Sequence, residues 1–201
     1  MMAQKFYYKG LVLNIPEGVY APSEDSLLFA ETLENMQLKG IKVLEIGTGS
    51  GFLAILAARK NAKVDACDIN PIAVKAARKN AEANGAVFRA FVSDLFKNVK
   101  GRYEIIIFNP PYLPEDEEDE IAGRSMQYSG GRHGNKIIKK FLDGAKRHLN
   151  KDGRILIVIS SLTKHVGMKK YGFETRVIGK RKMWFEELLL MELTIKRNMP
   201  I

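Results

Sequence analysis

The chain has a single cysteine, Cys67, in 201 residues. One cysteine can form neither an internal disulfide nor a cysteine-based zinc cluster, so no metal site is expected. No apolar run approaches the roughly 18 residues that a membrane span needs. The first ten residues, MMAQKFYYKG, lack the apolar region of a secretory signal. These absences favour a protein of a reducing, cytoplasmic compartment with no membrane association.

The balance of charge is basic but uneven. The 32 lysines and arginines exceed the 23 aspartates and glutamates, which gives a net charge of +9. Six of the acids form one run, EDEEDE, at residues 115–120, so the rest of the chain carries 32 − 17 = +15. A basic surface favours acidic or phosphate-rich partners such as RNA, DNA or a ribosome-linked factor. A merely solubilising surface is the alternative.

Segments with strand and helix patterns alternate along the chain. The sequence predicts strands at 41–47, 62–69, 86–94, 103–109 and 153–160. It predicts helices at 51–61, 70–85, 134–150 and 162–172. Two closing strands are expected within residues 173–196, joined by the basic turn GKRKM.

This alternation predicts an α/β fold with a mostly parallel seven-stranded sheet and helices on both faces. The two closing strands predict an antiparallel hairpin at one edge of the sheet. The length suits one domain over residues 1–201, with a leader at 1–33 and the core at 34–201.

A glycine-rich turn, EIGTGSG at residues 45–51, follows the first predicted core strand. Its members Gly47, Thr48, Gly49 and Gly51 allow a sharp turn and a close approach of a ligand to the backbone. The spacing differs from the G-x-G-x-x-G dinucleotide fingerprint. Such a turn can also serve packing alone, so by itself it is a weak signal.

Two aspartates end the next two predicted strands. Asp68 follows Gly51 by 17 residues, where an acid can accept hydrogen bonds from ribose hydroxyls. Its alternative role is to cap the helix that begins near Asn70. Asp94, followed by apolar Leu95, could accept from an adenine amino group, or could be a turn aspartate. Together these residues predict an adenosine site at the carboxyl ends of the strands.

The tetrapeptide Asn109-Pro110-Pro111-Tyr112 ends the fourth predicted core strand. The Asn109 side-chain oxygen and the Pro110 carbonyl, whose direction Pro111 fixes, can accept two hydrogens from a planar NH2 group. Tyr112 can stack on the flat face of that group. Binding both hydrogens localises the nitrogen lone pair, so methyl transfer would need positioning rather than a strong base. A simple strand-ending turn is the alternative.

The stretches EIGTGSG, DIN, SDLF and NPPYLP resemble those of class I S-adenosylmethionine-dependent methyltransferases of the HemK type. Residues 19–33 and 129–142 are also similar to that family, so the resemblance covers about residues 19–195. It implies a Rossmann-like fold and methylation of the glutamine side-chain amide in the Gly-Gly-Gln motif of a peptide-chain release factor. The short archaeal and eukaryotic branch fits this length, and it implies a small zinc-binding activator subunit.

The resemblance also implies particular contacts. It places Ser26, Glu45, Gly47, Asp68, Asp94, Leu95 and Asn109 around the cofactor, and the adjoining Thr48, Gly49, Gly51 and Ile69 complete the expected site. The residues Asn109, Pro110, Pro111 and Tyr112 would hold the substrate glutamine, and the stretch PSEDS would cover the cofactor. Ser26 could equally cap a helix that begins at residue 27.

Other functions stay open on the residues alone. The same tetrapeptide suits methylation of adenine N6 or guanine N2 in nucleic acid, although a base would have to flip into the pocket. A non-catalytic adenosine-binding scaffold is a further alternative, and an NAD dehydrogenase is the least favoured. The acidic run at 115–120 could contact a basic release factor or could be a solvated loop; at the entrance it would repel phosphates.

Overall fold

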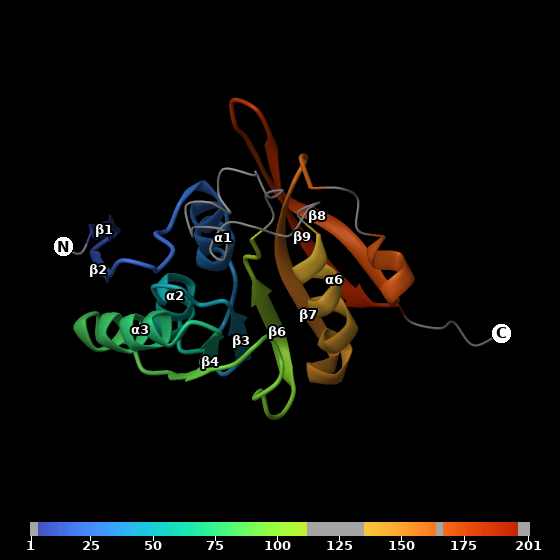
Figure 1. Cartoon of the computed structure of the whole chain (residues 1–201). Coiled ribbons are helices and arrows are strands. Elements are labelled where there is room, and N and C mark those ends of the chain that lie inside the picture. The colour runs from blue at the N-terminus through green and yellow to red at the C-terminus, as the bar shows by residue number, and fades with distance from the viewer. Residues whose placement is uncertain (1–3, 112–134, 164–166, 197–201) are drawn as a thin grey trace.

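The computed structural model describes residues 4–111, 135–163 and 167–196 (Figure 1). Seven strands form one sheet in the order β5-β4-β3-β6-β7-β9-β8. Their bounds are β3 Lys42–Ile46, β4 Lys63–Asp68, β5 Arg89–Val92, β6 Tyr103–Phe108, β7 Leu149–Ser160, β8 Phe173–Lys182 and β9 Glu187–Ile195. The first five are parallel, and β9 runs antiparallel to both β7 and β8. The predicted sheet and its antiparallel edge hairpin are confirmed.

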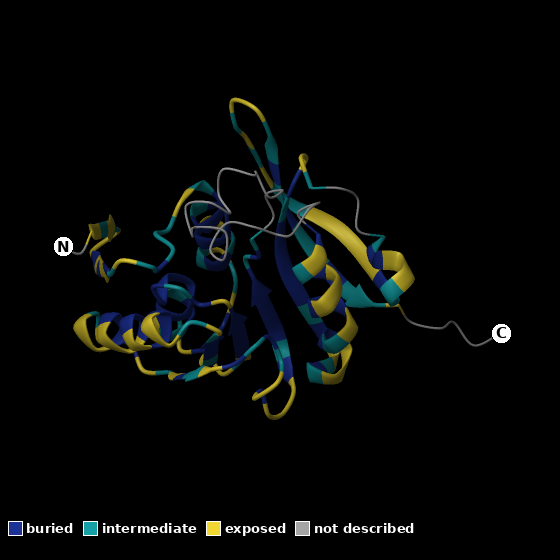
Figure 2. Cartoon of the chain, in the orientation of Figure 1, coloured by how far each residue is buried: buried dark blue, intermediate teal, exposed yellow. Residues whose placement is uncertain are grey.

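Helices cover both faces of the sheet. They are α1 Glu24–Glu34, α2 Phe52–Arg59, α3 Pro71–Ala83 and α6 Lys136–Ala145. One core cluster joins the first three to strand residues such as Val43 and Ile105. The other joins α6 to Leu44 and Ile106, their chain neighbours on the opposite face. Successive residues of the central strands alternate between the two clusters, so these strands are buried on both faces, whereas the edge strand β8 is largely exposed (Figure 2).

A small hairpin precedes α1 and was not predicted. Its strands, β1 Gln4–Tyr8 and β2 Leu11–Ile15, pair antiparallel. Two asparagines one turn apart, Asn80 on α3 and Asn84 at its C-cap, exchange side-chain hydrogen bonds with the β2 backbone at Asn14 and Val12. Their amides satisfy backbone groups as a neighbouring strand would, which fixes the hairpin against α3.

Three predicted elements differ in the structure. The region 162–172 is no α-helix where it is described: it holds only the short 3₁₀ helix η2 Met168–Tyr171, which ends at Gly172 in the left-handed region. The helix predicted at 134–150 ends at Ala145 and continues as the 3₁₀ turn η1 Lys146–His148. Strand β8 runs on to Lys182, so the hairpin turn lies beyond most of GKRKM. Long cationic side chains suit an edge strand.

Within the described residues, no helix is long and apolar enough to cross a membrane.

Candidate functional site

The turn between β3 and α2 is the centre of the candidate site. Gly47, Gly49 and Gly51 all have positive φ. Gly51 is the N-cap of α2, and its backbone has the left-handed α conformation. A Cβ on Gly51 would lie 2.9 Å from the Cα and Cβ of Ala77 on α3. This glycine is therefore required by helix packing, whereas Gly49 faces the backbone oxygen of Tyr20, 3.6 Å from its ideal Cβ position.

Glu45 lies under this turn and is 3% exposed. Its Oε2 accepts hydrogen bonds from Thr48 Oγ1 at 2.6 Å and from the Ala54 amide at 3.0 Å. Burial raises the pKa of the Glu45 carboxyl to about 8, against the lowering effect of these two donors. The carboxyl group thus ties the glycine-rich turn to the first turn of α2.

Asp68 connects the same turn to the start of α3. Its Oδ2 accepts from the Gly49 amide and its Oδ1 from the Asn70 amide, both at 2.9 Å. Asn70 itself caps α3 through the Ile72 amide. Burial raises the pKa of Asp68, opposed by its backbone donors. Asp68 is therefore not the helix cap that was its alternative role, although it holds the capping residue, and its oxygens retain lone pairs for further donors.

Asp94 and Leu95 follow β5, next to Asp68. The Ser93 amide donates to the Asp68 carbonyl at 2.9 Å, which joins the two strand ends. Leu95 has φ of +49°, a rare backbone conformation for a non-glycine residue. The Asp94 carboxylate forms an ion pair with Lys140 of α6 at 3.0 Å.

Apolar side chains stand beside these two carboxylates. Ile69 is 61% exposed directly after Asp68, although it is a large apolar residue. Leu95, by contrast, is 9% exposed. The end of the sheet between β4 and β5 therefore offers carboxylates and apolar surface together, as a purine nucleoside requires.

Asn109 follows β6 and carries an unsatisfied acceptor. Its Oδ1 is buried and has no hydrogen-bond partner among the residues that the structure describes. The preceding Phe108 stacks on Phe141 at 4.4 Å between ring centroids and lies 3.9 Å from the ideal Cβ position of Gly47, which places Asn109 beside the glycine-rich turn. Pro110 is buried, and Pro111 is half-buried. Tyr112 and the acidic run 115–120 lie outside the described residues.

The segment before α1 lies across the glycine-rich turn. The Tyr20 hydroxyl donates to Asp25 Oδ2 at 2.8 Å, and Asp25 Oδ1 accepts from the Ser26 hydroxyl at 3.0 Å. Both Asp25 and Ser26 are buried within α1, whose N-cap is Ser23. Ser26 is therefore not the helix cap that the sequence allowed.

The structure adds contacts of four residues to which the sequence analysis gave no individual role, namely Tyr20, Asp25, Ser93 and Lys140. Asp25 belongs to the predicted cover PSEDS, but only its contact with Tyr20 reveals a buried, hydrogen-bonded carboxylate. Ser93 accepts from the Asn98 amide and donates to the Leu95 carbonyl, which holds Leu95 in its unusual conformation. Lys140 comes from a helix 46 residues after Asp94, so no local signal could pair them.

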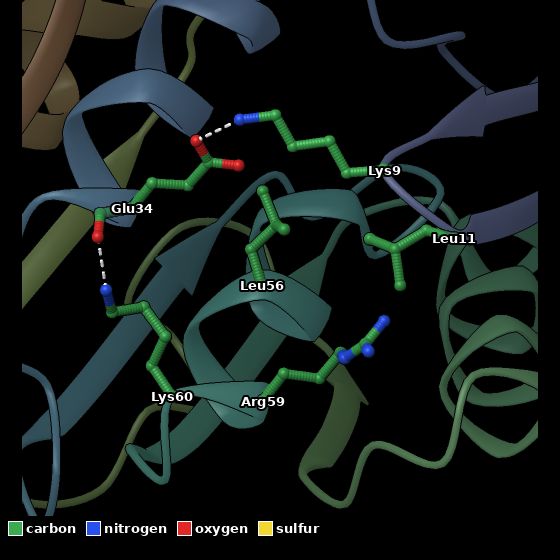
Figure 3. A pocket seen from close by; sticks show the side chains of 6 residues that line it. All are labelled: Lys9, Leu11, Glu34, Leu56, Arg59 and Lys60. Carbon is green, nitrogen blue, oxygen red and sulfur yellow. Dashed lines mark hydrogen bonds and ion pairs between the residues drawn. The ribbon is translucent and has the colours of Figure 1, made fainter.

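A surface pocket lies at the far end of α2 and is separate from this site (Figure 3). It is lined by Lys9, Leu11, Glu34, Leu56, Arg59 and Lys60. Glu34 forms an ion pair with Lys9 at 2.5 Å and accepts through its backbone oxygen from Lys60. These contacts join the β1–β2 turn to the ends of α1 and α2.

The family model of the methyltransferase small domain matches residues 16–184. The chain belongs to this methyltransferase family. A Methanocaldococcus jannaschii protein, only provisionally named a protein N5-glutamine methyltransferase, is 39% identical over 91% of this chain and 95% of its own length. The methyltransferase is dependent on S-adenosylmethionine, as its family is.

Other relatives of this methyltransferase act on different substrates. The release factor glutamine methyltransferase of Lactococcus lactis is 33% identical over 76% of this chain and 60% of that enzyme. Ribosomal RNA small subunit methyltransferase C of Escherichia coli K12 is 33% identical over 79% of this chain and 44% of that enzyme. The chain therefore spans less than two thirds of either enzyme.

Solved structures confirm the Rossmann-like methyltransferase fold. The Thermus thermophilus 16S rRNA N2 G1207 methyltransferase, in complex with AdoMet and guanosine, matches with a TM-score of 0.73 and 21% identity over 97% of this chain and 50% of that one. A Pyrococcus furiosus methyltransferase matches with a TM-score of 0.68 and 24% identity, over 92% and 89% of the two chains.

The residues present fit S-adenosylmethionine. Carboxylates end β4 and β5 beside the apolar side chains of Ile69 and Leu95, and the glycine-rich turn brings backbone close to the same edge. The buried oxygen of Asn109, which is unpartnered within residues 4–111, 135–163 and 167–196, lies at the same ends of the strands. An adenosine with a reactive methyl group would find acceptors and apolar surface where the strands end.

Proposed function

We propose that this chain methylates the side-chain amide nitrogen of the glutamine in the Gly-Gly-Gln motif of a peptide-chain release factor. The observation that carries the proposal is the Asn109 Oδ1 at the end of β6, a buried acceptor that finds no partner in the described part of the chain. A buried acceptor left unsatisfied costs about 1–3 kcal/mol, so its retention points to a donor supplied by a substrate.

The cofactor would be held by residues of three strand ends. Asp68 would accept from ribose hydroxyls and Asp94 from the adenine amino group, with Ile69 and Leu95 against the flat faces of the base. Gly47, Thr48, Gly49 and Glu45 would shape the turn that approaches it, and Tyr20, Asp25 and Ser26 would form its cover. When bound, S-adenosylmethionine supplies an electrophilic methyl group. The ion pair of Asp94 with Lys140 supports a fixed position for that carboxylate.

The substrate amide would be held by the tetrapeptide. Asn109 Oδ1 accepts one N–H and the Pro110 carbonyl accepts the other, while Pro111 fixes the direction of that carbonyl. With both hydrogens held, the lone pair of the amide nitrogen is localised and can point toward the electrophilic methyl group. Tyr112 would stack on the amide plane. Positioning and fixed dipoles then supply most of the rate enhancement.

Glu45 does not serve as a general base in this proposal. Its carboxyl lies beneath the glycine-rich turn and is engaged by Thr48 and Ala54. A base must reach the proton that it removes. The amide proton would leave to solvent after the nitrogen has formed its bond to the methyl carbon.

Methylation of guanine N2 or adenine N6 in nucleic acid is the second candidate. It is favoured by the net charge of +9 and by the similarity to the ribosomal RNA methyltransferase of E. coli. The same two acceptors suit an exocyclic NH2 group, so the tetrapeptide alone does not separate a base from a glutamine.

A competition experiment separates the two candidates. One reaction would hold labelled S-adenosylmethionine, the matching release factor, its Gly-Gly-Gln→Gly-Gly-Ala variant, and single- and double-stranded RNA and DNA. It would be run with and without a small zinc-binding activator subunit. Label on the wild-type factor alone, located on the glutamine by mass spectrometry, is the expected result. Label on nucleic acid would overturn the proposal in favour of the second candidate.

A further inference from the structure

Two aromatic side chains stand in solvent at the tip of the β8–β9 hairpin. Trp184 is 94% exposed and Phe185 is 86% exposed. Their ring centroids lie 6.2 Å apart, so the two rings contact each other. Exposed apolar side chains that are contiguous, rather than scattered singly, mark interaction surfaces.

Turn chemistry does not explain these residues. The Met183 amide donates to the Glu186 carbonyl at 2.8 Å, which closes the hairpin around Trp184 and Phe185. Hairpin loops of this length favour glycine, asparagine and aspartate. Neither residue at this tip has a positive φ, and neither is buried. Two aromatic residues at this position serve neither the turn nor the core.

The tip lies on the side of the sheet where the parallel strands have their carboxyl ends, and Asn109 lies on the same side. Strand β7 is parallel to β6 and pairs with β9 up to Ser160 and Leu188. The hairpin continues past that pair to Lys182 and Glu187. It therefore extends beyond the carboxyl ends of the parallel strands, as Figure 1 shows in dark red at the top.

The hairpin is held in place at its base. Arg181 forms ion pairs with Glu24, at 2.6 Å, and with Glu31, both on α1. Ser160 donates its hydroxyl to Glu186, and Met183 packs against the core cluster beneath α1. An aromatic tip fixed in this way loses little conformational entropy when it binds.

The charges around the tip favour a protein over a nucleic acid. Among the described residues, three cations lie with four carboxylates there: Lys180, Arg181 and Lys182 with Glu24, Glu31, Glu186 and Glu187. Contact with phosphates needs uncompensated cations, and the described part of this neighbourhood has no excess of them. The ring planes of Trp184 and Phe185 are inclined at 56°, which forms a knob rather than parallel platforms for stacked bases.

We infer that the Trp184–Phe185 tip docks into an apolar groove of the protein that carries the methylated glutamine, at a place outside the Gly-Gly-Gln motif. This inference rests on the proposed function and extends it with a second contact. The tip binds and orients the protein substrate while Asn109 holds the reacting amide. Aromatic anchors of this kind dominate the energy of protein interfaces.

The kinetic test compares the wild-type enzyme with Trp184→Ser/Phe185→Ser. Val87→Ser is the matched control, because Val87 is an 89% exposed apolar residue next to the amino ends of the strands. The tip variant should raise the KM for the full-length factor by about tenfold or more, with affinity for S-adenosylmethionine and kcat unchanged. Val87→Ser should change none of these quantities.

A binding test uses the fact that Trp184 is the only tryptophan. Enzyme labelled with 5-fluorotryptophan gives one ¹⁹F resonance, which should shift on addition of the Gly-Gly-Ala factor and not on addition of RNA. Methylation of the factor with an unchanged KM in the tip variant would overturn the inference alone. A shift with RNA only, or a shift that follows enzyme concentration because a second copy covers the tip, would also overturn it. Failure of the wild type to methylate the factor would overturn the proposed function as well.

Discussion

At the scale of single residues, two of the buried polar groups of the site, the Glu45 carboxyl and the Asn109 side-chain oxygen, are in opposite situations. The Glu45 carboxyl is satisfied by Thr48 and Ala54, so it serves the architecture of the glycine-rich turn. The Asn109 Oδ1 is also hidden from water but accepts no hydrogen bond from any described residue. Because native proteins rarely leave a buried acceptor unpaired, the second group is the better candidate for contact with a substrate.

Removal of the Asn109 amide should therefore affect the reaction more than the binding of the cofactor. For Asn109→Ala we expect a loss of roughly 10²–10³ in kcat, the range found when one fixed polar group at a reacting centre is removed. Calorimetry should show affinity for S-adenosylmethionine within about tenfold of wild type. The exposed Asn35→Ala is the matched control and should keep full activity. Equal activity in Asn109→Ala and wild type would refute the mechanism.

Glu45 gives a prediction about pH. Its pKa is raised from an ordinary value of 4.5 to about 8, mainly by burial, so the folded protein holds the proton more tightly than the unfolded chain. The stabilisation from this proton is complete below pH 4.5 and is lost as the pH rises through 8. Without cofactor, the unfolding free energy of wild type should fall relative to that of Glu45→Gln across this range. Urea titrations at a series of pH values measure it, and parallel pH profiles would contradict the assignment.

At the scale of elements, the parts of the site that the sequence predicts are those built from neighbours in the chain. The glycine-rich turn, Asp68 and the tetrapeptide each follow a strand, and parallel strands bring their ends together. The structure reproduces that juxtaposition through the Asp68–Gly49 hydrogen bond and the contact between Phe108 and Gly47.

The elements that were missed depend on partners distant in sequence. The β1–β2 hairpin is fixed by asparagines 66 and 72 residues away, and Arg181 reaches Glu24 across 157 residues. Such contacts leave no local pattern. The helix predicted at 162–172 failed for a different reason: Gly167 and Gly172 bracket its last part, and glycine favours turns over helix interiors.

Packing of α2 against α3 can be tested at Gly51. A methyl group there meets Ala77 at 2.9 Å in addition to a φ of +84°, whereas Gly40 has a φ of +79° and nothing within 4 Å of its Cβ position. Gly40→Ala should cost about 1–2 kcal/mol from backbone strain alone. Gly51→Ala should cost more, because one of the helices must shift. Urea denaturation of both variants measures the difference, and equal losses would show that packing does not require this glycine.

At the scale of the whole molecule, the two ends of the parallel strands differ in their balance of charge. Near the carboxyl ends, the cations of the β8–β9 hairpin are balanced by carboxylates of α1 and β9. The amino ends of β3, β4 and β6 instead share a basic surface pocket. Its cations are Lys42, Lys63, Lys100 and Arg102, and its one carboxylate, Asp65, is already paired with Arg89. We therefore expect nucleic acid to be attracted mainly to the amino ends of the strands, the side opposite to Asn109.

This separation predicts how RNA binding and catalysis respond to charge reversal. Lys63→Glu/Lys100→Glu should weaken RNA binding, measured by fluorescence anisotropy, and should flatten its dependence on salt because fewer phosphates are neutralised. The kcat and KM for the proposed release-factor substrate should stay at the wild-type values, since we propose that it approaches the carboxyl ends of the strands. The matched control is Lys180→Glu/Lys182→Glu, which reverses two charges near the hairpin tip. It should weaken RNA binding less than Lys63→Glu/Lys100→Glu does. If Lys63→Glu/Lys100→Glu abolished methyl transfer, the substrate would have to contact both the amino ends and the carboxyl ends of the strands. Nucleic acid would then be the better candidate.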